Sequence, residues 1–290
     1  MENYINDKKK LYSAILDFLK NSNEDENDDI YFNEIINIMK AQEIKGDCKE
    51  MQQFLRIIKN IGENHHRDQY FNEKMNQILL HYKEQIKQSI SNDELFYIFE
   101  NNKKIVLFLL KNGIIKMTES IYREMMYRIE PNGIRYWHFF IPEIENFNND
   151  KRIKFCKEEL LTENPNFFEN YEEKRQEGEN DLYICSLIRQ DSVEEFISLI
   201  NRYNISNSSI IPPSIFETNS FLIENKNTTL IEYSAFFGSI QIFQYLLLNN
   251  VELKPTLWLY AIHSKKGELI HFIESNEVHP PNYMKNNIFS

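Results

Sequence analysis

The chain has 290 residues, 42% of them hydrophobic, and a formal charge of -11 from 33 basic and 44 acidic side chains. This hydrophobic content can supply a core for one elongated array or for two compact domains, and it argues against a disordered chain. The acidic balance argues against a general nucleic-acid or anionic-membrane binder, because phosphate recognition depends on clustered Lys and Arg.

Cysteine content and hydropathy point to a reducing compartment. Cys48, Cys156 and Cys185 are odd in number and widely spaced, so they indicate neither a disulfide framework nor a zinc ribbon. No apolar run has the length of a transmembrane helix, and charges interrupt the apolar positions near the N-terminus. We therefore expect a protein of the cytoplasm, with the nucleus as the alternative, and no membrane insertion.

The first ninety residues contain amphipathic stretches at helical spacing. No segment competes with them as a strand, because few alternate polar and apolar residues with period two. A polar run after residue 20, Gly46 and Gly62 should separate the stretches. We expect about four helices, within residues 10–20, 31–39, 51–58 and 70–86.

Residues 91–178 continue the helical pattern with a clear start signal. Ser91 and Glu94 have the spacing of a capping box, in which each side chain bonds the backbone N–H of the other residue. Further helices are expected within residues 103–114 and at 118–128, followed by an aromatic, poorly periodic connection over residues 137–147. A helix, a loop around Pro165 and a short helix ending near Gly178 should follow.

Residues 228–253 predict two short helices joined by a tight turn. Gly238 would adopt the left-handed conformation that ends the first helix, and a more apolar helix would follow it. Two such helices cannot bury both apolar faces alone, so they need stacked copies on either side.

The same pattern recurs elsewhere in the chain. Residues 181–205 align without gaps, with Asp191 at the position of Gly238, and residues 103–114 match the second helix and its closing turn. Residues 206–226 form a long insertion between two of these units. Residues 257–278 form a last unit, with its turn expected at Lys266 and Gly267.

The chain after this last unit offers little to cover it. The segment after Pro281 is too short and too mixed for a polar-backed capping pair of helices. We therefore expect the second helix of the last unit to keep an apolar face toward solvent, which could mediate self-association.

The run TTLIEYSAFFGSIQIFQYLLLNNVEL resembles the ankyrin signature, matching it at Thr229, Ala235, Gly238, Leu246 and Leu247. It departs where the signature has proline, histidine and glycine, which are replaced by Leu230, Glu232 and Asn250. From about Gly178 the chain also resembles an uncharacterised ankyrin-related family that is abundant in trichomonad-type protists, closely over its C-terminal third and more loosely over residues 95–147. Members of that family usually carry further repeats after this point. The resemblance implies an ankyrin-type fold and protein binding, and it implies no enzymatic activity.

We accordingly predict an all-α protein in which a helical N-terminal region precedes a short, degenerate ankyrin-type solenoid. The expected domains are residues 1–90, a degenerate ankyrin-like segment at 91–178, a repeat domain at 179–282 that contains the insertion 206–226, and a tail at 283–290.

Chemical motifs are weak throughout. Residues 23–34 approach a calcium-loop pattern, but the position that needs glycine is Asp28, so a solvated acidic loop is favoured. His65 and His66 are adjacent and would point in different directions, and the spaced histidines His263 and His271 should lie on different helices. No nucleophile elbow, P-loop or dinucleotide fingerprint occurs. We expect no catalytic, cofactor or metal site.

The repeat pattern predicts a binding surface. The family resemblance places the two residues before each turn on a concave face, which gives a strip of Arg189, Gln190, Phe236, Phe237, His263 and Ser264. Two adjacent phenylalanines there could anchor a protein partner. The alternative, slightly favoured, is that they pack on the insertion or on the preceding helix.

The expected function is a non-catalytic protein–protein interaction scaffold that binds an unidentified protein through this face and binds no nucleic acid. The alternative is an assembly module that self-associates through its last repeat. An enzyme is the third and least favoured hypothesis.

Overall fold

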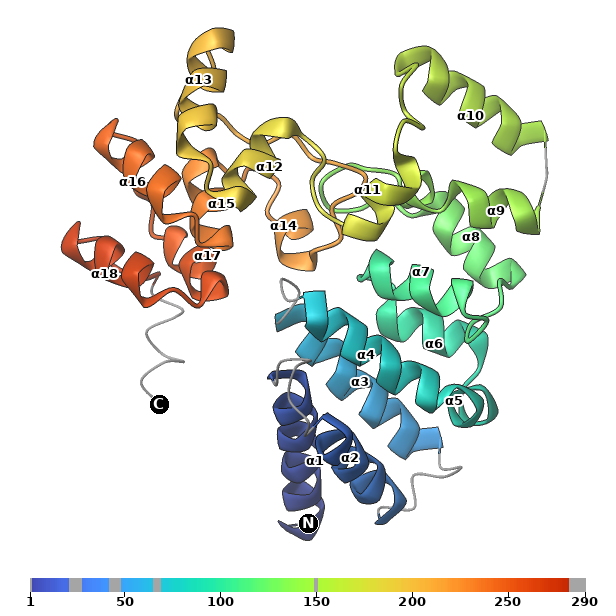
Figure 1. Ribbon diagram of the computed structural model, residues 1–290. Coiled ribbons are helices and arrows are strands. Elements are labelled where there is room, and N and C mark those ends of the chain that lie inside the picture. Colours follow the sequence, from blue (N-terminus) through green and yellow to red (C-terminus); the bar gives the residue numbers. More distant parts are fainter. Residues whose placement is uncertain (1, 21–27, 42–47, 65–68, 149–150, 282–290) are drawn as a thin grey trace. The chain divides into compact units, whose positions relative to one another are not determined.

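The computed structural model describes residues 2–20, 28–41, 48–64, 69–148 and 151–281. Its described residues form helices and no strand, with only two isolated bridges, Ile129 to Arg135 and Ile210 to Thr229 (Figure 1). The prediction of an all-α protein is confirmed. The chain divides into two compact units.

Unit 1 consists of residues 1–129, 135–178 and 218–220. Its helices are α1 (Glu2–Lys20), α2 (Asp28–Ala41), α3 (Cys48–Asn64), α4 (Gln69–His81), α5 (Lys83–Ser89), α6 (Asn92–Phe99), α7 (Lys103–Lys111), α8 (Glu119–Tyr127), the 3-10 helix η1 (Tyr136–Phe139), α9 (Ile141–Phe147), α10 (Lys151–Glu163) and α11 (Tyr171–Glu177).

Three sequence expectations for unit 1 differ from the structure. Gly62 does not break a helix but lies inside α3, where an added Cβ would come within 3.1 Å of the Met75 sulfur on α4. The glycine therefore allows a close approach between helices. Residues 137–147 are helical rather than irregular, because η1 and α9 bury Trp137, Phe139 and Ile144. The expected helix at residues 70–86 is divided into α4 and α5.

The α6–α7 pair has the features predicted for a repeat. Ser91 and Glu94 form the capping box at the start of α6, with both reciprocal bonds present. At the end of α7, Gly113 has a φ of 62°, and the Ile114 N–H reaches the Leu109 carbonyl at 2.9 Å. This bond from the residue after a left-handed position is the Schellman helix end.

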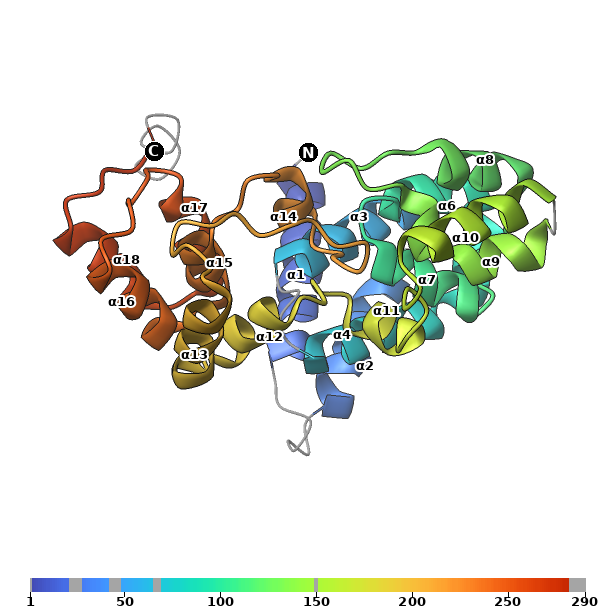
Figure 2. The same ribbon diagram turned by 90° about the horizontal axis from the view of Figure 1, so that it is seen from above.

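Unit 2 consists of residues 130–134, 179–217 and 221–290. Its helices are α12 (Tyr183–Gln190), α13 (Val193–Tyr203), the greater part of α14 (Ser220–Glu224), α15 (Leu230–Phe237), α16 (Ile240–Leu248), α17 (Leu257–Ser264) and α18 (Gly267–Ser275). α12 with α13, α15 with α16 and α17 with α18 form three pairs. α15 packs between α12 and α17, while α16 contacts α13 (Figures 1 and 2).

The three pairs share one turn geometry. The first helix of each ends at a residue with positive φ, namely Asp191, Gly238 and Lys265, at 54°, 69° and 55°. The second helices are followed in the same way by Asn204, Asn250 and Glu277. Asp191 and Gly238 are thus equivalent, as the alignment predicted, while the third turn comes one residue earlier than expected.

Polar side chains at these turns connect neighbouring pairs. The Asp191 carboxylate accepts the backbone N–H groups of Gln241 and Ile242, both at 3.0 Å, and so caps α16 of the next pair. Glu232 completes a capping box with Thr229 and also accepts a 2.8 Å bond from the Thr256 hydroxyl at the start of α17. Glu232 therefore bonds within its own pair and to the next one.

The face of the last pair differs from the expectation. On α18, Leu269 and Ile273 are buried and Ile270 and Phe272 are half-buried, so none of these four side chains is fully exposed. The exposed apolar side chain lies on α17, where Ile262 is 46% exposed.

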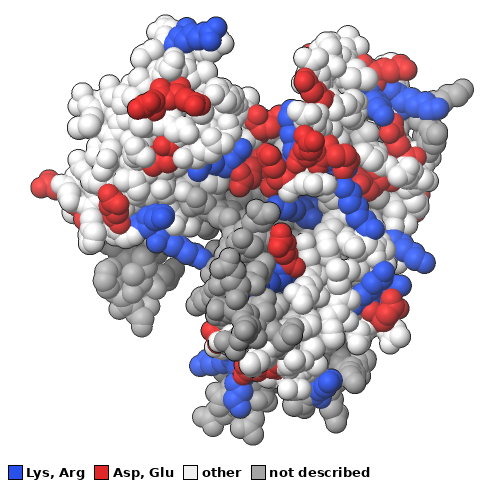
Figure 3. Space-filling view, viewed as in Figure 1, with Lys and Arg blue, Asp and Glu red and all other residues white. Residues whose placement is uncertain are grey.

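Charged side chains of both signs lie on the visible surface of the described residues (Figure 3). On the face that Figure 3 shows, Lys and Arg side chains are interspersed with Asp and Glu side chains. In the part of the chain that the structure describes, no helix is both long enough and apolar enough to cross a bilayer.

Candidate functional site

Hydrogen bonds to the start of the following helix hold the insertion, residues 206–226, in place. The Ile211 N–H donates to the Thr228 carbonyl at 2.8 Å, and the Leu230 N–H donates to the Ser209 carbonyl at 3.1 Å. Farther along, the Ser214 hydroxyl donates to Asp181 at 2.7 Å. These bonds hold the insertion beside the starts of α12 and α15, and all of it except residues 218–220 belongs to unit 2.

Phe221, on α14 of the insertion, packs on the first helices of two pairs. Its ring stacks on Phe236 of α15, with centroids 5.6 Å apart and planes 5° from parallel. It also meets Tyr260 edge-on at 4.9 Å and His263 at 4.4 Å, both on α17. The insertion thus fills an aromatic slot that α15 and α17 form.

The two predicted anchor residues are buried. Phe236 has no exposed surface and Phe237 is 5% exposed. Phe237 packs on Phe236 and on the Tyr233 ring, at centroid distances of 5.0 and 4.6 Å. Neither ring is open to a partner in this conformation. The slightly favoured alternative was that these rings pack on the insertion, and Phe236 does so.

The other four predicted residues also differ in accessibility. Ser264 is buried, and its hydroxyl donates to the Ala261 carbonyl at 2.6 Å. His263 is half-buried, and burial, followed by the charge of Lys265, lowers its pKa. Gln190 is the exposed member of the strip, next to half-buried Arg189. The six residues occupy equivalent turn positions but do not make a continuous exposed strip.

Arg189 belongs to a polar cluster in unit 2. Its guanidinium bonds Glu179 at 2.5 Å, the Asn180 carbonyl at 2.8 Å and the Tyr233 hydroxyl at 3.1 Å. Cys185 lies in the same cluster and is fully buried, and this burial raises the pKa of its thiol to about 12. Cys185 is therefore a neutral thiol at physiological pH and is not an activated nucleophile.

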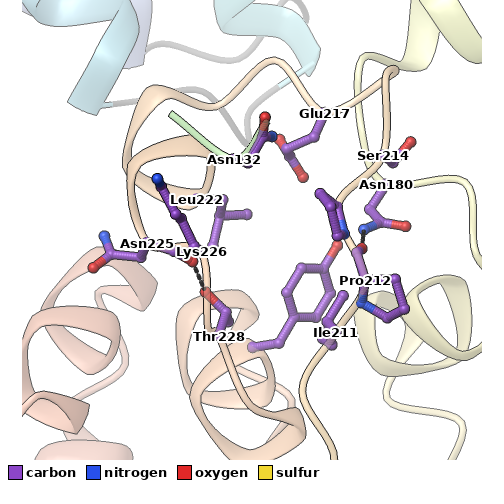
Figure 4. A pocket seen from close by; sticks show the side chains of 12 residues that line it. Asn132, Asn180, Ile211, Pro212, Ser214, Glu217, Leu222, Asn225, Lys226 and Thr228 are labelled. Atoms are coloured by element: carbon purple, nitrogen blue, oxygen red, sulfur yellow. Dashed lines mark hydrogen bonds between the residues drawn. The ribbon is translucent and has the colours of Figure 1, made fainter. Parts of the chain in front are cut away.

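A small cavity adjoins this cluster, as Figure 4 shows. Glu217, Asn180 and Ser214 lie around one part of it, and Asn225, Lys226 and Thr228 lie around another. It offers about 30 Å³ to solvent, enough for water and too little for a metabolite. Its polar lining is thus suited to hydrating the insertion rather than to binding a substrate. Most of its lining residues lie within residues 211–233, and the fold adds Asn132 and Asn180 from distant parts of the chain.

The histidines and the acidic loop give no joint site in the described part. His271 is exposed and lies 3.4 Å from Glu274, whereas His263 is held in the aromatic slot. Among the described residues, no group of three His, Cys, Asp or Glu side chains could hold a metal ion. His65 and His66, and most of the approximate calcium loop at residues 23–34, lie outside the described residues.

Comparisons with known proteins leave the chain without an assigned relative. No protein-family model matches it, and neither a curated protein nor a solved structure does.

Proposed function

We propose that the protein is a non-catalytic, ankyrin-type scaffold that binds another protein. The observation that carries the proposal is the repetition of one helix pair, with left-handed turns at equivalent positions and side chains that connect each pair to the next. Stacked pairs of this kind provide an extended surface, and their known use is protein recognition.

Part of the accessible first-helix surface lies on α12. Tyr183 is 59% exposed, and Gln190 is exposed seven residues later, which places both on the same side of the helix. Tyrosine combines a large contact area with a hydroxyl group, and it is enriched among residues that dominate binding energy. We therefore propose α12, rather than Phe236 and Phe237, as the contact surface for the partner.

Affinity capture with paired variants tests this proposal. We expect partners captured by the wild-type chain to be lost with Tyr183→Ala/Gln190→Glu, because the aromatic contact is removed and a charge is added. A matched control, Tyr203→Ala/Gln241→Glu, changes exposed residues of α13 and α16 and should retain them. Equal recovery with both double variants would overturn the assignment to α12.

A second candidate function, self-association, is favoured by α17. Its buried residues Leu257, Tyr260, Ala261 and Ser264 face the core, whereas Leu259 and Ile262 lie on the opposite side and are half-buried and exposed. Sedimentation equilibrium should show a concentration-dependent dimer that Ile262→Glu abolishes. A monomer at every concentration would exclude this function.

A further inference from the structure

A side chain of the insertion occupies the aromatic slot between two repeat pairs of unit 2. Phe221 of α14 lies against Phe236 of α15 and against Tyr260 and His263 of α17, at ring-centroid distances of 5.6, 4.9 and 4.4 Å. Phe236 and Tyr260 are buried, whereas Phe221 is half-buried, so the slot is open to solvent at one edge. The repeat helices thus form a site for an aromatic ring, and its present occupant comes from outside the repeat.

The contacts in the slot are ones that any aromatic side chain can make. Aromatic rings attract each other in offset-stacked and edge-on arrangements, whatever backbone carries them. The connection between the next two pairs, residues 249–256 from α16 to α17, is much shorter than the one that carries Phe221. The walls of the slot therefore belong to α15 and α17, and the insertion supplies only the occupant.

The segment that carries Phe221 is a loop whose two ends are held together. The Ile211 N–H donates to the Thr228 carbonyl at 2.8 Å, beside the bridge of Ile210 to Thr229. Compact loops with adjacent ends are frequently functional elements of proteins. Because these bonds lie at the base of the loop, α14 can leave the slot while the base and the repeat helices stay in place.

Two features lower the free energy that is needed to move α14. It has five residues, too few for a helix that is stable alone. A cavity of about 30 Å³ separates Leu222 and Asn225 on one side from Ile211 on the other, so packing there is incomplete (Figure 4). Sparsely packed segments open locally, without unfolding of the whole domain. The burial of Leu222 and Ile223 keeps the closed state in the majority.

We propose that the slot is a second recognition site, which takes an aromatic side chain of a protein partner, and that Phe221 is its internal competitor. The inference rests on the proposed protein-binding function but concerns a surface other than α12. A partner ring that enters the slot replaces Phe221 on Phe236, Tyr260 and His263. Its apparent affinity is lower than its intrinsic affinity by the fraction of molecules in which α14 has left the slot.

Nuclear magnetic resonance titration with a small aromatic probe tests the site. The probe is N-acetylphenylalaninamide, and N-acetylleucinamide is its aliphatic control. Phe221→Ala removes the competitor, so this variant should bind the aromatic probe at least tenfold more tightly than the wild-type chain does, and at least tenfold more tightly than it binds the aliphatic control. The ring signals of His263 should shift on binding, whereas those of His271, which is exposed on α18, should not.

A matched variant controls for the loss of an aromatic ring. Phe155→Ala, at an exposed side chain of α10, should bind the aromatic probe as the wild-type chain does. Circular dichroism verifies that both variants are folded.

Hydrogen exchange of the wild-type chain tests the opening of the slot without any variant. The Asn225 N–H, which donates to the Phe221 carbonyl at 3.1 Å, reports on α14, and the Ile211 N–H reports on the base of the loop. We expect protection from exchange to be at least a hundredfold lower at Asn225 than at Ile211, and the aromatic probe to lower it further.

Either of two results overturns the proposal. One is equal protection of Asn225 and Ile211, which would show that α14 moves only when the loop base also opens. The other is a Phe221→Ala variant that binds the aromatic probe no more tightly than the wild-type chain. Because the probes are small molecules, both results would refute the slot and leave the capture test of α12 unaffected.

Discussion

At the scale of single residues, Asp191 performs two structural tasks. It adopts the left-handed conformation that ends α12, and its carboxylate caps the first turn of α16. Gly238 occupies the equivalent turn without a side chain, because an added Cβ would lie 2.9 Å from the Lys266 Cγ. Contacts with the neighbouring helix pair thus determine which residue occupies each of these equivalent turns.

Removing the Asp191 carboxylate should destabilise the folded state. Asp191→Ala loses both acceptors and also places alanine at positive φ, so we expect a loss of about 2 kcal/mol. Asp191→Asn keeps one acceptor and a residue that tolerates this conformation, so its loss should be smaller. Urea unfolding measures both, with Glu252→Ala, an exposed loop change, as the control. Equal stability of Asp191→Ala and the control would contradict the capping role.

His138 makes stability depend on pH. Burial, followed by the charges of Arg135 and Lys103, lowers its pKa to about 4. Because the folded pKa is below the unfolded value of about 6.5, the unfolded state binds more protons between these values, and stability falls as pH falls through this range. Between pH 7 and pH 5 the loss from His138 should be about 2 kcal/mol.

The substitution His138→Gln should remove this part of the pH dependence. His271→Gln changes an exposed histidine and should leave the dependence as it is in the wild-type chain. The measurement is urea unfolding at a series of pH values from 7 to 5. An unchanged slope in His138→Gln would show that this histidine is not the source.

At the scale of elements, α14 depends on what it packs against. A helix of five residues is not stable alone, and Leu222 and Ile223 are buried while Phe221 lies in the aromatic slot. The side chains of α14 therefore connect the insertion to the repeat pairs.

Removing the Phe221 ring tests that connection. Phe221→Ala should destabilise unit 2 by about 2–4 kcal/mol, because an aromatic side chain leaves a packed site. It should also raise the pKa of His263 toward the ordinary histidine value, because the ring that buries it is gone. Histidine NMR titration follows this change, and Phe155→Ala, at a side chain 65% exposed, is the control. A His263 pKa that stays low in Phe221→Ala would contradict the role assigned to the slot.

Features that neighbouring residues determine could be predicted from the sequence, whereas features that depend on contacts between distant residues could not. The capping box at Ser91 and the turns at Asp191 and Gly238 could be predicted, because neighbouring residues determine each of them. Periodicity missed α9 and α14, which are short and owe their burial to contacts with other elements. The burial of Phe236 could not be derived from the repeat pattern, since Phe221 in the insertion covers it.

At the scale of the whole molecule, the same kind of helix pair occurs in both compact units. α6 and α15 each start with a capping box and have 8 residues, and α7 and α16 have 9 residues each. Both second helices end with a left-handed residue followed by an aliphatic residue, Ile114 in one and Val251 in the other. This agreement supports one repeated building unit that occurs in both compact units.

Hydrogen exchange on the captured complex tests this account most directly. Mass spectrometry would compare exchange of backbone amides in the chain alone and with its partner. The account predicts slower exchange in α12 on binding and little change in α13 and α16. Protection confined to α13 and α16, or no partner that protects any part of α12, would contradict it.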